Sequence, residues 1–523
     1  MSEPTPTSYD GVPYIGHAYP QSYPDRLAVI GSLFGLQPTD VKRCRVLEVA
    51  CGDGGNLIPL AFSLPESTFT GIDLAASAIA RGMQTVSALK LSNISLFQID
   101  LSSLSKAFGQ FDYIIAHGVY SWVAPDVRNK ILEICKNHLL PNGIAYVSYN
   151  AYPGGHIRDM VSEMMKFHVR RCFEPEQKVK QSRAFLRFLI DANSTAENPY
   201  GNLIQKELDR LVACDDSIVY HDDLSNFRQP VYFYQFIESA AQQGLQFLAE
   251  ADFSEMQTEI YPATVVETLD RLRDDILLKE QYLDFLKWRS FRQTLLVHTG
   301  IAVRRTPDAA AILHFHIASQ AKPVSPQPDF SPGTIEEFRA PRKGAVKTDH
   351  ELGKAALTYL AQTWPSASTF ETLRAEASAM AAQSGEPQAS NSQELCEILL
   401  QLYAGGLLEL HVHTPSFVTY ISDRPVASPL ARLQVLTGNI VTALNYASIK
   451  LEDSLSRNLV QLLDGTRDRA AIKRDLKQLV TAGRATVLVK GSSVEDASVA
   501  LEIISSQLDL CLKKFASFPL LLE

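Results

Sequence analysis

The chain has no excess of positive charge. Its 523 residues include 49 Lys and Arg against 58 Asp and Glu, which gives a formal net charge of −9. Proteins that bind nucleic acid usually present a basic face, because Lys and Arg neutralise the phosphates. The composition therefore argues against a nucleic-acid partner and weakly favours cationic partners, such as proteins with accessible lysines.

Cysteine is scarce and scattered. The seven cysteines are an odd number, and none of them lies in a C-x-x-C pair. Because disulfide frameworks and zinc sites both need paired or clustered cysteines, we expect no disulfide scaffold and no metal. Cys51 lies in a glycine-rich turn without an identifiable partner base, so we interpret it as a small side chain packed beside a ligand and not as a nucleophile.

Long apolar runs and targeting signals are also missing. The first residues, MSEPTPTSYDG, contain no basic stretch followed by an apolar one. No later segment supplies the run of about 20 apolar residues that a membrane-spanning helix needs. We therefore expect a cytoplasmic protein with no membrane span. A chain of this length exceeds what one core can bury, which predicts roughly two to four domains.

The most informative segment that is present is RVLEVACGDGGN, residues 45–56, an apolar β run with Glu48 followed by a glycine-rich turn. Gly52 and Gly54 allow the backbone to bend sharply and approach a ligand, and a helix beginning near Asn56 would point N–H groups at a carboxylate or phosphate. About 20 residues later, TFTGIDL places Asp73 at the end of a second β run, where an acid can bind a ribose hydroxyl. The combination predicts a nucleotide-like ligand at the strand ends.

Three further β runs follow in order. NISLFQIDL ends near Asp100, and FDYIIAHGVYSWV and LLPNGIAYVSYN predict a fourth and a fifth strand. Strands that alternate with helical segments predict a Rossmann-like parallel sheet with its site at the carboxyl ends of the strands. Asp73 and Asp100 could also cap the helices that follow them, since Asp is a favoured N-cap residue, and both roles are compatible.

The same α/β sheet gains its last two strands much later in the chain. A helix and an extended run in FYQFIESAAQQGLQFLAEADF, and the run SFRQTLLVHT at 290–299, complete a seven-stranded sheet with helical insertions. The predicted division is a lid at 1–42, with Tyr14, His17 and Tyr19 either over the ligand or packed on the sheet edge, and a core at 43–303. Regulatory or substrate insertions are expected at about 155–230 and 252–290.

The second half of the chain predicts separate domains. Residues 304–345 have the proline-rich composition of a linker. Three helical patterns and the run LLELHVHTPSFVTY at 407–420, which alternates as a strand pair, predict a winged-helix-like domain at 346–425, with a loop at 381–393. A helical domain is expected at 426–523. The third helical pattern, SQELCEILLQLYAGG, contains no Arg or Lys, which argues against a helix that reads DNA.

The turn after the first β run resembles motif I of class I S-adenosylmethionine (AdoMet) methyltransferases. Their E-x-G-x-G-x-G pattern appears here as Glu48, Ala50, Gly52 and Gly54, with alanine in place of the first glycine. An alanine methyl group is tolerated there if the residue keeps a negative φ. An NAD site is the alternative, but the acid on the first strand departs from the dinucleotide fingerprint.

The resemblance extends over nearly the whole chain. YDGVPY, CGDGGNLIPLA, NAYPGGH, YHDDLSNFRQPVYFYQF, FRQTLLVH and LLDGTRDR are similar to bacterial AdoMet methyltransferases with a methyltransferase regulatory domain, among them the rickettsial protein lysine methyltransferases that modify outer membrane proteins. The resemblance implies AdoMet as cofactor and S-adenosylhomocysteine (AdoHcy) as product. The resemblance also implies which residues bind the cofactor: Glu48, Ala50, Gly52, Gly54, Asp73, Leu74, Asp100, Leu101 and His117. PGGH differs from the PGWH of the family and removes an indole near the expected acceptor pocket.

Candidates for the acceptor site follow the fourth and fifth β runs. Methyl transfer to an amine needs alignment at about 3 Å, exclusion of water and a neutral nucleophile, and aromatic faces can hold the ammonium before it deprotonates. We assign Trp122 as a wall of the acceptor pocket and Tyr152 as a ligand of the acceptor, with Asn150 beside them as the third catalytic candidate. The substrate candidates are Tyr120, Trp122, His156 and His221.

Tyr120, Trp122 and His221 each have an alternative interpretation that involves no substrate. Tyr120 and Trp122 could be core residues between loop and helix, as aromatics beside apolar runs often are. His221, followed by Asp222 and Asp223, could be a base oriented by carboxylates or a solvated turn, and we favour the turn. None of the three is secured by the sequence pattern alone.

The function expected from these patterns is methyl transfer from AdoMet to protein lysines. A small-molecule N- or O-methyltransferase is the alternative within enzymes, with regulation or homo-oligomerisation to account for the extra domains. An AdoMet-sensing winged-helix regulator and a catalytically silent homologue are alternatives of another class. The intact acids and glycines of the first three β runs argue against the silent homologue.

Overall fold

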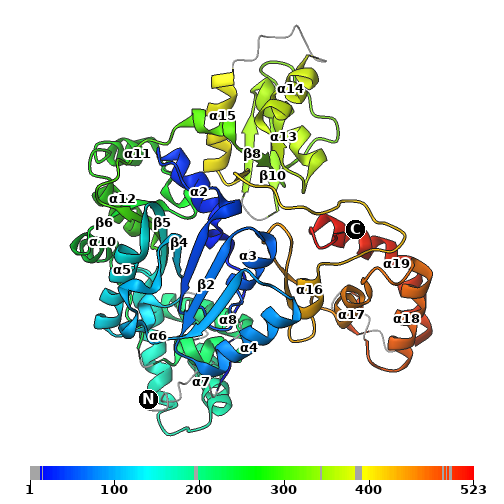
Figure 1. Ribbon diagram of the computed structural model, residues 1–523, viewed down its shortest axis with the longest axis horizontal. Helices are drawn as coiled ribbons and strands as arrows, with labels where there is room; N and C mark the ends of the chain where they lie inside the picture. The colour runs from blue at the N-terminus through cyan, green and yellow to red at the C-terminus, as the bar shows by residue number, and fades with distance from the viewer. Residues whose placement is uncertain are drawn as a thin grey trace.

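The computed structural model describes residues 12–14, 16–193, 198–225, 227–341, 344–382, 392–485, 488–489, 492–493 and 497–522. Figure 1 shows an α/β body around a central sheet, a yellow-green body formed by α13, α14 and α15 above it, and an orange and red body with α16 to α19 to its right. Within the described ranges, no helix combines the length and the apolar content needed to cross a bilayer.

The central sheet has seven strands in the order β3-β2-β1-β4-β5-β7-β6. They are β1 (Arg45–Val49), β2 (Thr68–Asp73), β3 (Ile94–Gln98), β4 (Phe111–Ala116), β5 (Leu139–Asn150), β6 (Leu245–Glu250) and β7 (Phe291–His298). β1 to β5 pair in parallel, and β7 is antiparallel to both β5 and β6. The predicted Rossmann-like seven-stranded sheet is thus confirmed, and the carboxyl ends of β1, β2 and β4 share one edge.

Alternating side chains of the strands enter two different cores. On β1, Val46 packs with Leu27 and Leu57 in one cluster, whereas Leu47 packs with Ile131 and other residues in a second cluster. This alternation follows from the pleat of a strand buried on both faces. The covering helices are α2 (Pro24–Leu33), α3 (Leu57–Ser63) and α4 (Ala76–Ala88) on the first face, and α5 (Pro125–His138) and α10 (Phe233–Gln242) on the second.

Both regions expected as insertions contain helices. The first holds α6 (Gly155–His168), α7 (Pro175–Ala192), α8 (Pro199–Ala213), α9 (Asp216–Ile218) and a π-helix η6 (Val219–Asp223), with a small core of its own around Val161 and Leu186. The second holds η7 (Phe253–Met256), α11 (Ala263–Asp270) and α12 (Ile276–Lys287). A buried ion-pair cluster ties the second to the sheet, because Arg292 of β7 contacts Glu250 of β6 and Asp284 of α12 at 2.6 and 2.9 Å.

The region 304–345, which its composition predicts to be a linker, contains regular structure. It carries η8 (Ala309–His314), β8 (His316–Ala318), β9 (Lys322–Pro323), β10 (Glu336–Ala340) and β11 (Gly344–Thr348). β8 pairs with both β12 (Ser368–Thr369) and β13 (Glu409–His411), so this region is built into the next body. Such short strands separated by prolines show no periodicity that a sequence analysis could detect.

The three helices expected at 346–425 are present as α13 (Glu351–Thr363), α14 (Phe370–Ala381) and α15 (Ser392–Ala404). The predicted strand pair at 407–420 is wrong, since only β13 forms there and it pairs with β8 instead of folding back as a hairpin. Most of the loop expected at 381–393, namely 383–391, lies outside the described residues.

The last body begins with a helix and a short hairpin that approach the sheet. Its elements are α16 (Pro429–Gln434), β14 (Ile440–Thr442), β15 (Ser448–Lys450), α17 (Ser454–Leu462), α18 (Arg469–Thr481), β16 (Leu488–Val489), β17 (Ser492–Ser493) and α19 (Ala497–Ser517). Ser448 Oγ donates a hydrogen bond of 2.9 Å to the carbonyl of Ala18, which fixes the hairpin to the N-terminal segment.

Candidate cofactor and acceptor site

The turn after β1 is built from residues in the left-handed region. Ala50 and Gly52 both have φ of 56°, and Gly54 has φ of 75°. The condition of a negative φ at Ala50 is therefore not met. The turn keeps the left-handed backbone that a glycine would adopt there, at a cost of about 1–2 kcal/mol for an L-residue. A Cβ atom at Gly52 would meet nothing within 4 Å, so its open side leaves space for a ligand.

Asp73 at the end of β2 braces this turn. Its Oδ2 accepts a hydrogen bond of 2.8 Å from the Gly52 amide, and its Oδ1 accepts one of 2.8 Å from the amide of Ala75, just before α4. Burial raises the pKa of Asp73 above its ordinary value. Asp73 therefore braces the turn and the segment before α4, but it does not cap that helix, whose N-cap residue is Ala75 and has no side-chain cap. The interpretation of Asp73 as a helix cap is wrong, and its contact with a ribose stays a prediction.

Asp100 lies at the same edge, one strand further out. It is exposed, and its Oδ1 accepts hydrogen bonds of 2.8 Å from both the amide and the hydroxyl of Ser102, which caps the short helix η3 (Leu101–Ser103). Leu74 is 48% exposed next to Asp73, so apolar surface is available there for a flat ring. The predicted cofactor contacts of Asp100, Leu74 and Leu101 remain predictions.

Glu48 is the buried acid of the site. Its Oε1 accepts a hydrogen bond of 2.8 Å from Asn56 Nδ2, whereas Oε2 is inaccessible to solvent and has no partner among the described residues. Burial raises the pKa of Glu48 to about 8. A buried carboxylate oxygen without a partner is unfavourable, and a cationic donor would satisfy it. The ammonium group of the methionine part of AdoMet is such a donor, so the residues present fit this cofactor.

The N-terminal segment covers the turn, as a lid would. Tyr19 stacks on His117 with ring centroids 3.6 Å apart, and the Gly16 amide donates a hydrogen bond of 3.3 Å to Asp53 in the turn. His117 follows β4, and its Nδ1 lies 2.9 Å from the Tyr146 hydroxyl of β5. Burial lowers the pKa of His117 to about 3, so its imidazole is neutral at physiological pH.

The exit loops of β4 and β5 meet, as the acceptor assignment requires. Ser121 Oγ accepts a hydrogen bond of 2.8 Å from the Asn150 amide, which places the loop with Trp122 against the end of β5. Trp122 is partly exposed, but Tyr120 is only 3% exposed and packs edge-on against Phe236 at 5.1 Å. The plainer interpretation of Tyr120 as a core residue is therefore the one that the structure supports.

Tyr152 and His156 form part of an aromatic cluster beside these loops. Their rings stack at 3.9 Å, and the Tyr152 hydroxyl donates a hydrogen bond of 2.8 Å to Asp159. Tyr232 lies 5.3 Å from Tyr152 and 6.3 Å from Phe285, which extends the cluster onto α12. Tyr232 and Phe285 were not singled out from the sequence, because aromatic residues in helical segments are more often core residues.

His221 has neither of the roles considered for it. It is 5% exposed within the π-helix η6, and its Nε2 lies 2.7 Å from the carbonyl of Val12. Asp223 instead pairs with Arg158 and Arg210, at 2.7 Å in each case. His221 is thus neither a base oriented by carboxylates nor a solvated turn, because the N-terminal segment covers it from a distance in sequence that local patterns do not reveal.

A cavity of about 610 Å³ lies where β6 ends and β7 begins. Its walls include Trp288 before β7 and Phe291 and Gln293 within β7. The Phe291 ring lies 6.3 Å from that of His117, and Gln293 Nε2 donates a hydrogen bond of 2.9 Å to Tyr146. The cavity therefore borders the cofactor side of the sheet edge, and the sequence analysis, which identified β7 only as a strand, missed these residues.

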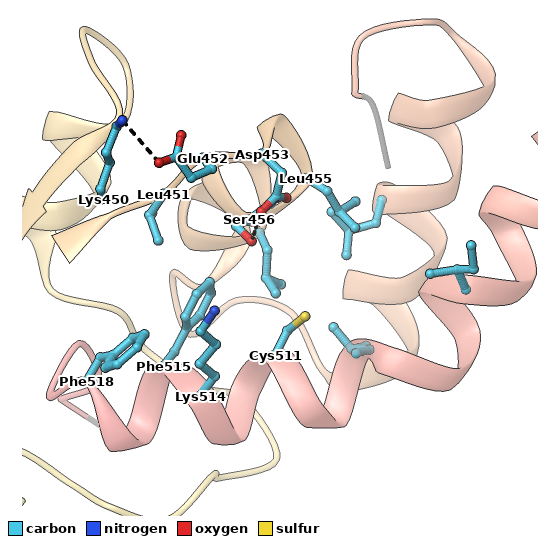
Figure 2. A pocket seen from close by; sticks show the side chains of 14 residues that line it. Lys450, Leu451, Glu452, Asp453, Leu455, Ser456, Cys511, Lys514, Phe515 and Phe518 are labelled. Atoms are coloured by element: carbon cyan, nitrogen blue, oxygen red, sulfur yellow. Dashed lines mark hydrogen bonds and ion pairs between the residues drawn. The ribbon is translucent and has the colours of Figure 1, made fainter. Parts of the chain in front are cut away.

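A second cavity, of about 220 Å³, lies in the C-terminal body (Figure 2). Its walls come from β15, α17, α18 and α19, with Leu451, Cys511 and Phe515 inside and Lys450 and Lys514 beside them. None of the predicted site residues lines it. Among the described residues there is also no group of three or more His, Cys, Asp or Glu side chains able to hold a metal ion.

Family models match three parts of the chain. A methyltransferase domain matches residues 47–145, and a predicted methyltransferase regulatory domain matches residues 215–298. The C-terminal winged helix domain of PKMT matches residues 423–520. The winged-helix match thus falls on the region that the sequence predicted to be helical, one body beyond the three helices at 346–425.

Relatives match along the whole length. An uncharacterized protein of Rickettsia prowazekii is 29% identical over 98% of this chain and 93% of its own, and a second from that organism is 38% identical over 46% of this chain and 96% of its own. The solved structure of PKMT2 from Rickettsia typhi in complex with AdoHcy matches with a TM-score of 0.85 and 30% identity, covering 98% of this chain and 100% of that one. This chain therefore belongs to the family of AdoMet-dependent methyltransferases that carry a methyltransferase regulatory domain and a PKMT winged helix domain.

Proposed function

We propose that this methyltransferase transfers the methyl group of AdoMet to lysine side chains of a protein. The observation that carries the proposal is the similarity to Rickettsia typhi PKMT2 over 98% of this chain and 100% of that one. The AdoMet-binding sheet alone would not support a substrate, because methyltransferases with many different acceptors share it. Similarity that extends through the lid, the insertions and both C-terminal bodies includes the regions that select an acceptor.

AdoMet supplies an electrophilic methyl group on a sulfonium, and the chain supplies binding and exclusion of water. In the proposed site Glu48 holds the ammonium, the open side of Gly52 accommodates the amino-acid part, and Asp73 binds the ribose. Tyr19, stacked on His117, covers the cofactor from solvent. Positioning of this kind contributes most of the acceleration expected for a methyl transfer between aligned groups.

A lysine acceptor must lose its proton before it attacks, although its free pKa is about 10.4. The cavity beside His117 offers Trp288 and Phe291, whose aromatic faces can hold the ammonium until it deprotonates. The carboxylates that also line the cavity, Glu250, Asp252 and Glu255, would attract the cationic side chain. The neutral imidazole of His117 adds no positive charge that would repel the incoming ammonium. In this proposal Trp122 remains a wall. Tyr152 remains a ligand of the acceptor, since its oxygen can accept a hydrogen bond while donating to Asp159.

Labelled AdoMet tests the proposal with the full chain. We expect label in lysine-containing polypeptides, none after the lysines have been acetylated, and none with the Glu48→Gln variant. Label confined to small metabolites would overturn the protein substrate in favour of a small-molecule N- or O-methyltransferase. Binding of AdoMet with no transfer to polypeptide or metabolite would favour a sensor.

A further inference from the structure

A tyrosine from the C-terminal body reaches into the turn after β1. Tyr446, between β14 and β15, is 1% exposed and stacks on Tyr23 with ring centroids 4.9 Å apart. Its hydroxyl lies 2.8 Å from Asn56 Oδ1 and within hydrogen-bond distance of the Asn56 carbonyl, and its single proton is shared between these two acceptors. The two residues are separated by 390 positions in the sequence, and Asn56 directly follows the glycine-rich turn.

Asn56 connects three parts of the chain. Its Oδ1 accepts a hydrogen bond of 2.8 Å from the Tyr19 amide of the lid. The same oxygen lies 2.8 Å from the Tyr446 hydroxyl, whose single proton it shares with the Asn56 carbonyl. Its Nδ2 donates the bond of 2.8 Å to Glu48 Oε1. Because an amide side chain accepts only through its oxygen and donates only through its nitrogen, two donors on the oxygen side turn the nitrogen toward Glu48.

We propose that Tyr446 is a positioning residue of the cofactor site: through Asn56 its hydroxyl holds the Glu48 carboxylate and the Tyr19 backbone in the arrangement that binds AdoMet. The inference deepens the proposed function and rests on the assignment of Glu48 to the cofactor. It extends the site beyond the methyltransferase domain match at 47–145 to a residue of the winged helix match at 423–520.

Two further features fit a positioning role. Tyr446 has φ of 66°, and a tyrosine is held in the left-handed region only where its surroundings fix it. The bond from Ser448 Oγ to the Ala18 carbonyl anchors the same hairpin one residue before Tyr19. The hairpin thus contacts the lid at Tyr23, through the ring of Tyr446, and at Ala18, through Ser448. In this proposal the cofactor site is complete only while the C-terminal body packs against the lid.

Tyr446→Phe in the full chain tests the hydroxyl alone, because phenylalanine keeps the ring that stacks on Tyr23. We expect the Kd for AdoHcy, measured by calorimetry, to rise about 5- to 10-fold, as the loss of buried hydrogen bonds predicts. Tyr420→Phe is the matched control, since Tyr420 belongs to the same C-terminal region and is 61% exposed. An unchanged Kd for Tyr446→Phe would overturn the proposal.

A double-mutant cycle separates positioning from general destabilisation. If the hydroxyl acts through Asn56, Tyr446→Phe adds no further loss of AdoHcy affinity in an Asn56→Ala background. A full additional loss in that background would overturn the proposal. The Glu48→Gln variant distinguishes a failure of the cofactor assignment of Glu48 from a failure of the positioning role of Tyr446. Wild-type affinity in Glu48→Gln would refute the cofactor assignment itself. Weak binding by Glu48→Gln together with normal binding by Tyr446→Phe would refute only the role of Tyr446.

The pH profile of AdoHcy affinity gives a second test that does not require Asn56→Ala to fold. The bond from Asn56 favours the charged form of Glu48, whereas the nearby carboxylates Asp53 and Asp73 disfavour it. The tyrosines Tyr19 and Tyr446, which also face Glu48, stay neutral because burial raises the pKa of each. We expect Tyr446→Phe to move the profile to higher pH, and an unmoved profile would contradict the proposal.

Discussion

Tyr19 and His117 stack with ring centroids 3.6 Å apart and planes inclined by 26°. Tyr19 belongs to the N-terminal segment, and His117 follows the central strand β4. The stack therefore joins the lid to the rigid sheet across the place proposed for the cofactor. The lid, which is held by ring contacts such as those of Tyr19 and Tyr23 and by hydrogen bonds, can open for exchange of AdoMet and AdoHcy and close for the transfer.

The stack sets the first prediction. Tyr19→Ala should accelerate AdoHcy dissociation about 3- to 10-fold, because a stacked aromatic pair contributes about 0.5–1.5 kcal/mol. Tyr19→Phe should dissociate at the wild-type rate, since the ring is kept and the bond to Asn56 comes from the backbone amide in either variant. Stopped-flow fluorescence measures both rates. Equal rates for the two variants would show that the ring does not hold the lid.

Glu48 sets the second prediction, because burial raises its pKa to about 8 in the cofactor-free chain. Between about pH 6 and pH 7 the group is protonated, whereas binding of an ammonium requires the carboxylate. AdoHcy binding should therefore release up to one proton, and affinity should rise up to about tenfold per pH unit in this window. Calorimetry in buffers of different ionisation enthalpy measures the number of protons that are released when AdoHcy binds. Glu48→Gln should bind weakly and show neither effect.

The raised pKa of Glu48 also makes the stability of the folded protein depend on pH. A carboxyl whose pKa is 4.5 when unfolded and about 8 when folded binds more protons in the folded chain between these values. The cofactor-free protein should therefore lose stability as pH rises from about 4.5 to about 8. Glu48→Gln should melt at a higher temperature than wild type above pH 8. A lower melting temperature for the variant there would mean that Glu48 is already paired in the folded protein.

Asp73 sets the third prediction. Asp73→Ala should weaken AdoHcy binding by at least about 1 kcal/mol, through the loss of ribose contacts and of the bond that fixes the Gly52 amide. Asp73→Asn keeps one side-chain oxygen as an acceptor for the turn but loses the charge and part of the ribose contact, so its affinity should lie between those of wild type and Asp73→Ala. Calorimetry that finds all three affinities equal would reject the assignment.

The sheet and the first half of the site were predictable from the sequence. The strands β1 to β5 are mostly apolar runs, with Glu48 inside β1, Asp73 at the end of β2 and Asp100 two residues after β3, and such local patterns predict strands and a ligand site at their ends. The bond by which Asp100 caps η3 is local, which is why it could be anticipated, whereas the bond from the Gly52 amide to Asp73 joins the turn after β1 to the end of β2.

What failed or was missed depends on contacts between distant residues. The burial of His221 comes from Val12, and the bond between Tyr446 and Asn56 spans 390 positions. The hydrophobic periodicity of the sequence predicts neither contact. The strands β8 and β9 are two or three residues long and form only because partners elsewhere pair with them.

Ala50 sets the last prediction, because its φ of 56° is strained for any residue with a Cβ atom. Ala50→Gly should stabilise the cofactor-free protein by about 1 kcal/mol, since relief of the left-handed backbone outweighs the added entropy of the unfolded chain. Ala80→Gly is the matched control. Ala80 is exposed within the helix α4, where glycine costs about 1 kcal/mol, so the same substitution should destabilise there. Opposite shifts in melting temperature are expected, and a destabilised Ala50→Gly variant would mean that the alanine methyl group makes a contact worth more than the strain.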